Sequence, residues 1–468
     1  MQRRTTTAAA TPAWRRLCLL AAGTLVAATA CSSVVPDDID FAAARCQLVI
    51  DDGVDGLPTF DLGALLEVTT PEGAVDEYSA GYIRAMRLAI EELNDGRDIG
   101  GRRVRLRVCD THADWAIGGG QISRDLATWL IDEAGVEAII ADASTETQTI
   151  QSVTVARSKL LMAISATSED LTWLADDGLV WRVAPSDVYQ GIVLAHMASQ
   201  TVAASDTIAV VAVKSPYGDG LAASISMALG KRAAVHTFDA DGGGIDAAVA
   251  GAAADNAAAV IVVASVGATA EIVNQRAKHA ELSGAALFLA DGACDGSLMD
   301  QPLDTGVSLV GARCTRPGQP PTATYNSFAE RFSKAYGADP AETAYAQHAF
   351  DVVYCIALAH AWALGSGGDG NVSGKAIAEG LKHLSAGEPY PFMPNRITAM
   401  VGSLLKGEDI NVDGASGPLN FNPETGEAPS GYETQKVDAA GKLVSDGWFG
   451  IEDLGGGKYK VGPIEATP

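Results

Sequence analysis

The feature that most constrains the fold is a regular alternation of short β-rich runs with amphipathic helical stretches, from Phe60 to about Gly311. Segments with the 3.6-residue helical period, separated by short apolar runs, are typical of βαβ units, which build parallel sheets with helices on both faces. The expected strands are Phe60–Val68, Val104–Cys109, Val136–Ala141, Leu160–Ile164, Thr207–Val213, Val235–Phe238, Ala258–Val263, Leu287–Ala290 and Val307–Val310. The helices expected between them are Ser79–Asn94, Gly119–Asp132, Thr147–Arg157, Asp187–Gln200, Gly218–Gly230, Ile245–Ala254 and Ala268–Ala280. Nine strands exceed what one compact doubly wound domain needs, so the pattern predicts two such sheets.

The pattern changes twice along the chain. Arg182–Asp187 lies midway in the array and ends the first unit, and after Gly311 only helical segments follow. These helices are expected at Thr324–Tyr336, Thr343–Leu364 and Ser373–Leu384, before a Gly- and Pro-rich tail. The chain is therefore predicted to be an α/β protein of two lobes.

Length and charge exclude several classes of function. The chain has 468 residues, enough for two or three domains that each bury a core. It carries 58 acidic against 33 basic residues, a net charge of −25 that would repel a polyanion, so we expect no nucleic-acid partner. No segment beyond the N-terminus is expected to span a membrane, because the longest apolar stretch, Ala247–Ala270, is split by Asp255 and Asn256.

The N-terminus predicts export. Residues 1–30 contain four arginines, no acid and the apolar run Leu17–Ala30, which is the pattern of a secretory signal. The sequence Ala28-Thr29-Ala30-Cys31 resembles a bacterial lipobox, which implies that Cys31 is diacylated and becomes the mature N-terminus. The alternative is a plain secreted protein cut after Ala30. Residues 31–58 are then expected to be an acidic tether, and removal of residues 1–30 changes the net charge from −25 to −29.

The remaining cysteines fit an oxidising compartment. Beyond Cys18 in the signal and Cys31, five remain: Cys46, Cys109, Cys294, Cys314 and Cys355. None forms a C-x-x-C pair, which argues against a zinc ribbon or a thioredoxin-type motif, and we expect no metal or cofactor. An odd number predicts one or two disulfides and at least one free thiol. Cys294 and Cys314, the nearest pair, are the expected bridge, and the pairing of the other three stays open.

Polar clusters follow several of the expected strands. Open α/β sheets bind ligands beyond the carboxyl ends of their strands, where helix N-termini present free N–H groups. The clusters at such positions are Ser144–Thr147, Ser165–Ser168, Lys214–Gly220 and Asp291-Gly292. Each could be an ordinary helix cap or turn. Two hydroxyl clusters at adjacent strand ends nevertheless indicate an anion-binding cradle.

The order of these motifs resembles a known family, the type I periplasmic binding proteins, and most closely the branched-chain amino-acid (Leu/Ile/Val) receptors of ABC transporters. The resemblance covers roughly residues 60–435 and rests on these segments in order: Ala89–Asn94, Ser144-Thr145, Ala166-Thr167, Ser186-Asp187, Tyr217–Gly220 and Ser416–Pro418. It implies two Rossmann-like lobes that are joined by three crossover hinge segments and close on a ligand. The crossings are expected near Arg182–Asp187, Cys314–Gly318 and Ser416–Glu424. Lobe 1 would comprise residues 59–184 and 316–417, and lobe 2 residues 185–315 and 418–468.

The resemblance also implies a ligand site. In lobe 1 the hydroxyl and main-chain N–H groups of Ser144, Thr145 and the segment Ser165-Ala166-Thr167 would hold the α-carboxylate of an amino acid. Tyr78, expected in the loop before its helix, would pack on the ligand. In lobe 2 the resemblance assigns Tyr217 and, for the α-ammonium, Asp291. This chain departs from the family at Asp291, where the family usually has Glu, and at Val266-Gly267, where the family has an aromatic residue.

The function implied is that of an exported, lipid-anchored monomer that faces the periplasm or the cell exterior. It would bind an amino acid or a related small polar molecule and deliver it to the membrane permease of an ABC transporter. One alternative is a sensor subunit that signals to a membrane receptor. Another is an exported enzyme, although the sequence contains no G-x-x-x-x-G-K-[ST], H-E-x-x-H or G-x-S-x-G motif. The identity of the ligand, the choice between transport and sensing, and the membrane that carries the anchor stay open.

Overall fold

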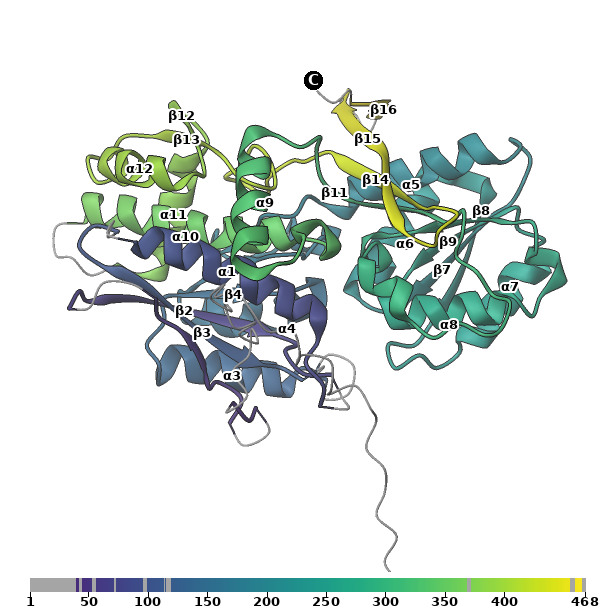
Figure 1. Ribbon diagram of the computed structural model, residues 1–468, viewed down its shortest axis with the longest axis horizontal. Helices are drawn as coiled ribbons and strands as arrows, with labels where there is room; N and C mark the ends of the chain where they lie inside the picture. The colour runs from purple at the N-terminus through teal and green to yellow at the C-terminus, as the bar shows by residue number, and fades with distance from the viewer. Residues whose placement is uncertain are drawn as a thin grey trace, which may run out of the picture.

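The computed structural model describes residues 39–464, with gaps at 42–43, 53–55, 71–72, 96–98, 113, 115–118, 368–371 and 455–458. The chain forms two lobes, each built on one sheet (Figure 1). The signal sequence expected over residues 1–30 and the lipidation expected at Cys31 lie outside the described residues.

Lobe 1 contains a six-stranded sheet in the order β1-β3-β2-β4-β5-β6. Strands β2 to β6 are mutually parallel, and β1 pairs antiparallel with β3 at the edge. Every residue of β4 and β5 is buried, as in parallel strands that helices cover on both faces. The strands are β1 (Leu48–Ile50), β2 (Thr59–Leu66), β3 (Arg103–Asp110), β4 (Ala138–Ala141), β5 (Leu160–Ala163) and β6 (Val180–Arg182).

The helices of lobe 1 come from two distant parts of the chain. They are α1 (Glu77–Asn94), α3 (Gln121–Asp132), α4 (Ser144–Ala156), α9 (Ala323–Tyr336), α10 (Ala346–Ser366), α11 (Gly374–Leu381) and α12 (Ile397–Leu404). A small parallel pair, β12 (Glu388–Pro391) and β13 (Ile410–Asp413), completes the lobe. Contrary to the expectation from sequence, α10 is long and apolar enough to cross a membrane. However, 78% of its apolar window is buried, so α10 is the central core helix of this lobe.

Lobe 2 contains an eight-stranded sheet in the order β16-β15-β14-β11-β10-β9-β7-β8. Strands β7 to β11 are parallel, and the last three extend the sheet antiparallel. The strands are β7 (Ile208–Val213), β8 (Ala233–Phe238), β9 (Ala259–Val263), β10 (Ala286–Leu289), β11 (Arg313–Pro317), β14 (Tyr432–Val437), β15 (Leu443–Asp453) and β16 (Tyr459–Pro463). The helices are α5 (Asp187–Thr201), α6 (Pro216–Leu229), α7 (Ile245–Ala254) and α8 (Val266–Arg276).

One expected strand is wrong. Residues Val307–Val310 form no strand, and Val310 is 53% exposed. The parallel strand next to β10 is instead β11, Arg313–Pro317, whose polar residues concealed it in the sequence. Thr315 and Arg316 are nevertheless buried there, because Arg316 forms an ion pair with Glu433 of the neighbouring strand β14 (2.9 Å).

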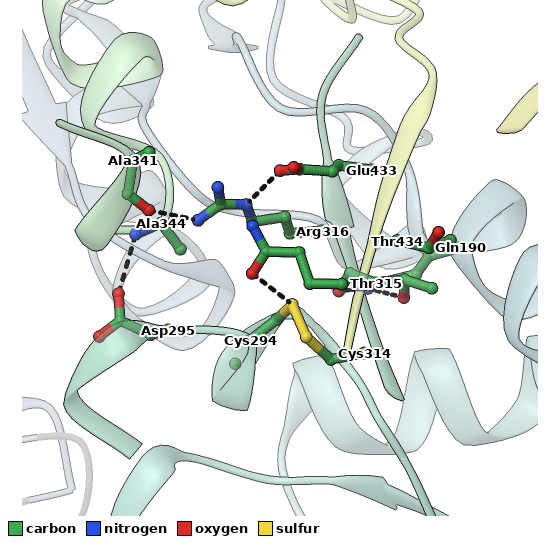
Figure 2. The surroundings of a disulfide bond; sticks show 12 residues. Gln190, Cys294, Asp295, Cys314, Thr315, Arg316, Ala341, Ala344, Glu433 and Thr434 are labelled. Carbon is green, nitrogen blue, oxygen red and sulfur yellow. Dashed lines mark hydrogen bonds and ion pairs between the residues drawn. A yellow bond between two sulfur atoms is a disulfide. The ribbon is translucent and has the colours of Figure 1, made fainter. Parts of the chain in front are cut away.

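The disulfides also alter the expected boundaries. Cys46 is bonded to Cys109 of β3, and β1 follows Cys46 directly, so the tether expected over residues 31–58 ends before Cys46. An edge strand and a covalent bond fix this segment to lobe 1. The structure also contains a bond between Cys294 and Cys314, the pair favoured from sequence, which joins the loop after β10 to β11 (Figure 2). Cys355 is buried in α10 as a free thiol.

The chain passes between the lobes three times. It leaves lobe 1 after β6 to begin α5, returns after β11 to α9, and crosses again between β13 and β14. Glu427 of the last crossing forms an ion pair with Arg182, the final residue of β6, and thereby links the first and third segments. The carboxyl ends of the parallel strands point toward the region between the lobes (Figure 1).

Candidate ligand-binding cleft

The lobes contact each other across this region. The hydroxyl of Ser168, after β5, donates a hydrogen bond to the carbonyl oxygen of Pro216 at the start of α6 (3.0 Å). On the other side, the main-chain N–H of Ala344 in lobe 1 donates to the carboxylate of Asp295 in lobe 2 (2.8 Å; Figure 2). These two contacts join the lobes, and Asp187 and Asp291 are buried in the same region.

Two lobe 1 residues that were expected to hold the ligand carboxylate, Ser144 and Thr167, are hydrogen-bonded to each other. Ser144 is the first residue of α4, and its hydroxyl accepts hydrogen bonds from the main-chain N–H groups of Thr167 and Ser168 (both 3.0 Å). These two N–H donors are therefore engaged within the protein. The carbonyl oxygen of Ala166 accepts from Arg182 (3.2 Å), and the Ser165 hydroxyl donates to the carboxylate of Asp142 (3.0 Å).

The N-terminus of α4 has no side-chain cap. The residue before this helix is Ala143, whose side chain cannot cap it, so the first N–H groups, on Ser144 and Thr145, keep their donor capacity. The hydroxyl of Thr167 is buried next to them, makes no hydrogen bond of normal geometry within the described part of the chain, and lies near enough to Asp187 to lower the pKa of that carboxyl group. Thr145 is half-buried and its side chain makes no hydrogen bond to the described residues, which leaves it available to a ligand.

Asp291 lies between the two lobes. Its carboxylate accepts one hydrogen bond from the hydroxyl of Tyr217 in lobe 2 (2.7 Å) and one from the hydroxyl of Tyr345 in lobe 1. Tyr217 is held in place because Pro216 begins α6 and Ser215 caps it through the N–H of Gly218 (3.0 Å). Burial raises the pKa of Asp291, and its two tyrosine partners oppose that rise.

A second acidic side chain, Asp187, lies near Asp291, and the sequence did not predict that it belongs to the site. It is the first residue of α5, directly after the first crossing, and is completely buried. Neither of its carboxylate oxygens makes a hydrogen bond of normal geometry to the described residues, although the Thr167 side chain lies near enough to lower the pKa of this group. Burial raises its pKa well above the ordinary value, and the nearby carboxylate of Asp291 raises it further. The position of Ser186-Asp187 at the end of the first unit was the available sequence signal.

Aromatic rings line the lobe 1 side. Tyr78 lies in the first turn of α1 rather than in the loop before it, and its ring centre is 4.9 Å from that of Tyr82. Burial raises the pKa of the Tyr78 hydroxyl, and the surrounding carboxylates, chiefly Asp295, raise it further. Val266 begins α8 without a ring, as the sequence indicated. Tyr345 has a positive φ of 64°, and no local sequence pattern connects it with Asp291.

A separate cavity of about 760 Å³ lies beside the second and third crossings. It is lined by both lobes, including Arg316, Tyr325, Glu342, Ser416 and Trp448, and by none of the residues expected from sequence to bind ligand. Within the described part of the chain, no group of three or more His, Cys, Asp or Glu side chains is arranged to hold a metal ion.

Two lobes linked by three crossings, with buried polar groups between them, define a hinged binding protein. The chain matches the family described as periplasmic binding protein over residues 60–442, and it belongs to that family. This membership indicates a solute-binding protein that works outside the cytoplasm. It also establishes the type I fold expected from the sequence.

Relatives of different function share this fold. The chemotactic signal transduction system substrate-binding protein BasB of Halobacterium salinarum is 23% identical over 410 residues, 83% of this chain and 90% of BasB. The leucine-binding protein LivK of Thermotoga maritima has a TM-score of 0.67 at 18% identity, covering 83% of this chain and 98% of LivK. A solute-binding protein of Rhodopseudomonas palustris, solved with 3,4-dihydroxybenzoic acid, has a TM-score of 0.62 at 15% identity, covering 84% and 97%. Neighbours thus bind both zwitterions and aromatic acids, so the fold alone does not define the ligand.

Proposed function

We propose that the protein is a lipid-anchored solute-binding protein that captures an amino acid or related amine by closure of its two lobes and delivers it to an ABC transporter. The observation that carries the proposal is the fully buried carboxyl group of Asp187, whose two oxygens make no hydrogen bond of normal geometry to the residues that the structure describes. A buried, unpaired carboxylate is costly, and a ligand ammonium would offset that cost. The N-terminus of α4 and the Thr167 hydroxyl would hold a carboxylate of the same ligand.

Closure follows from the distribution of these groups. Lobe 1 supplies the helix N-terminus and Tyr345, whereas lobe 2 supplies Asp187, Tyr217 and Asp291. A ligand that contacts both sets is bound more tightly by the closed form than by the open one, and it therefore shifts the population toward closure. A membrane permease would recognise the closed arrangement.

Native mass spectrometry of the purified protein tests this proposal, because it detects a small molecule retained in the closed cleft. Calorimetric titration of the stripped protein with amino acids, amines and small carboxylates then measures the affinities. We expect at least one amine-bearing solute to bind with 1:1 stoichiometry. Failure of every solute to bind, with no co-purifying small molecule, would contradict the proposal.

A sensor is the second candidate, and the similarity to BasB favours it. Both functions need the same ligand-driven closure, so the cleft does not distinguish them. Crosslinking of the ligand-loaded protein in its native membrane distinguishes them directly. Recovery of a permease supports transport, whereas recovery of a chemoreceptor or histidine kinase supports sensing.

A further inference from the structure

The region between the lobes contains a concentration of acidic side chains for which the protein itself supplies no ion-pair partner. Five carboxylates lie at or next to the strand ends that face the cleft, and none forms an ion pair with a described Lys, Arg or His side chain: Asp76, Asp142, Asp187, Asp291 and Asp295. A low-dielectric cleft strengthens the repulsion between such groups. These groups can stay protonated when the protein is empty, and their joint ionisation would require a counter-charge from outside the chain.

Three basic side chains that follow or end strands at the same edge already form ion pairs with other acids. The pairs are Arg182 with Glu427, Lys214 with Asp239 (2.7 Å) and Arg316 with Glu433 (2.9 Å). Two of these pairs, those of Arg182 and Arg316, are largely buried and hold the crossing segments. Moving either arginine toward the cleft would leave its partner buried and unpaired, which is strongly unfavourable.

The carboxylates form two groups on opposite sides of the cleft. Asp187 and Asp291 belong to lobe 2, and the unpartnered oxygens of Asp187 show that one acceptor is unsatisfied. In lobe 1, Asp142 directly follows β4 and Asp76 caps α1 through the N–H of Ser79 (2.7 Å). The Ser165 hydroxyl donates a hydrogen bond to one oxygen of Asp142 (3.0 Å).

Tyrosine rings accompany the lobe 1 carboxylates. Burial raises the pKa of the Tyr78 hydroxyl, and the charges of Asp295, Asp142 and Asp291 raise it further, so these acids are near enough to act on it. The neighbouring Tyr82 is completely buried, and its hydroxyl makes no hydrogen bond of normal geometry to the described residues, with the side chains of Tyr78 and Ser165 nearby. Carboxylates beside aromatic faces attract an ammonium or guanidinium group through both charge and ring quadrupole.

We propose that the ligand carries two positive centres, one held by Asp187 and Asp291 and the other by Asp142 and Asp76 beside Tyr78. The ligand class is then a basic amino acid or a diamine, rather than a neutral branched-chain amino acid or an aromatic acid. This inference rests on the proposed solute-binding function and specifies its substrate. A basic amino acid would also use the N-terminus of α4 for its carboxylate, whereas a diamine would leave that terminus unused.

Calorimetry with the stripped full-length protein tests the inference. The probes are L-lysine, L-ornithine and 1,4-diaminobutane, compared with L-leucine and benzoate. The variants are Asp142→Asn, which keeps an acceptor for Ser165, and Asp76→Asn, which keeps the helix cap. Glu281→Gln is the matched control, because it removes one negative charge from an exposed position on lobe 2.

We expect a dicationic probe to bind wild type at least tenfold more tightly than leucine. Asp142→Asn should weaken that binding at least tenfold while Glu281→Gln leaves it unchanged. Tighter binding of leucine or benzoate than of all three dications overturns the inference and leaves the solute-binding function intact. Equal affinity of Asp142→Asn and Glu281→Gln for the dication overturns it as well. If no probe binds and no small molecule co-purifies, both proposals fail.

Discussion

Replacing Asp187 by Asn separates stability from binding. The wild-type carboxyl group is completely buried, and neither oxygen makes a hydrogen bond of normal geometry to a residue in the described ranges. Asn has nearly the same shape and no charge. An unsatisfied buried polar group costs about 1–3 kcal/mol, and a charged one costs more. We therefore expect the ligand-free Asp187→Asn protein to have a free energy of unfolding about 1–3 kcal/mol higher than wild type at pH 7.

The increase in the free energy of unfolding of Asp187→Asn over wild type should grow as the pH rises. The folded pKa of Asp187 is raised above its ordinary value of 3.8, so the folded protein retains a proton that the unfolded chain releases. Wild type therefore loses stability as the pH rises from about 4 toward the folded pKa, each pKa unit being worth about 1.4 kcal/mol. Well below pH 4 both states are protonated, so the advantage of Asp187→Asn should be small at pH 4 and disappear at lower pH.

Binding should change in the opposite direction. The ligand ammonium would lose a buried charge partner in Asp187→Asn, which costs about 2–5 kcal/mol, or roughly thirty-fold to several-thousand-fold in affinity. Urea unfolding at pH 4 and 7 and calorimetric titration measure the two effects. If Asp187→Asn binds the native ligand as tightly as wild type and is no more stable at pH 7, the assignment of Asp187 as the ammonium acceptor is incorrect.

Further predictions concern the anchor, the disulfide and pH. Cys31→Ala should release the protein from membranes into the soluble fraction, and unchanged membrane retention would exclude the lipid anchor. Loss of the Cys294–Cys314 bond, which spans 20 residues, should lower the free energy of unfolding by about 3 kcal/mol on the chain-entropy model, as measured by urea unfolding of Cys294→Ser. Burial raises the pKa of Asp142 to about 7, so a cation must displace a proton below that pH. Calorimetry should show affinity for a dication falling as the pH drops from 8 to 6, and a flat profile would argue against contact with Asp142.

The expected effect of Asp291→Ala on stability changes once the contacts are known. From the sequence, removal of this carboxylate should affect binding alone. In the structure it is the acceptor for two tyrosine hydroxyls, one from each lobe. Its loss leaves both donors buried and unpaired, so Asp291→Ala should also destabilise the ligand-free closed form. A binding defect in that variant therefore has to be compared with its unfolding curve.

The order of elements could be predicted from the sequence because the signals that define them are local. Buried parallel strands such as Ala138–Ala141 are continuous apolar runs, and helices such as Ile245–Ala254 match the expected bounds. The prediction was wrong where burial came from distant partners. The polar strand Arg313–Pro317 is buried only because Glu433, more than a hundred residues later, pairs with Arg316.

The candidate site also combines features that the sequence predicts with contacts that only the tertiary structure decides. Sequence position at strand ends located Ser144, Thr167 and Asp291, since the carboxyl edge of a parallel sheet follows from topology. Only the tertiary structure decided their contacts: Ser144 occupies the N–H groups of Thr167 and Ser168, and Tyr345 reaches Asp291 from the other lobe. Whether a carboxylate has a partner depends on groups that the fold brings from far along the chain. That is why the unpaired charge of Asp187 became visible only in three dimensions.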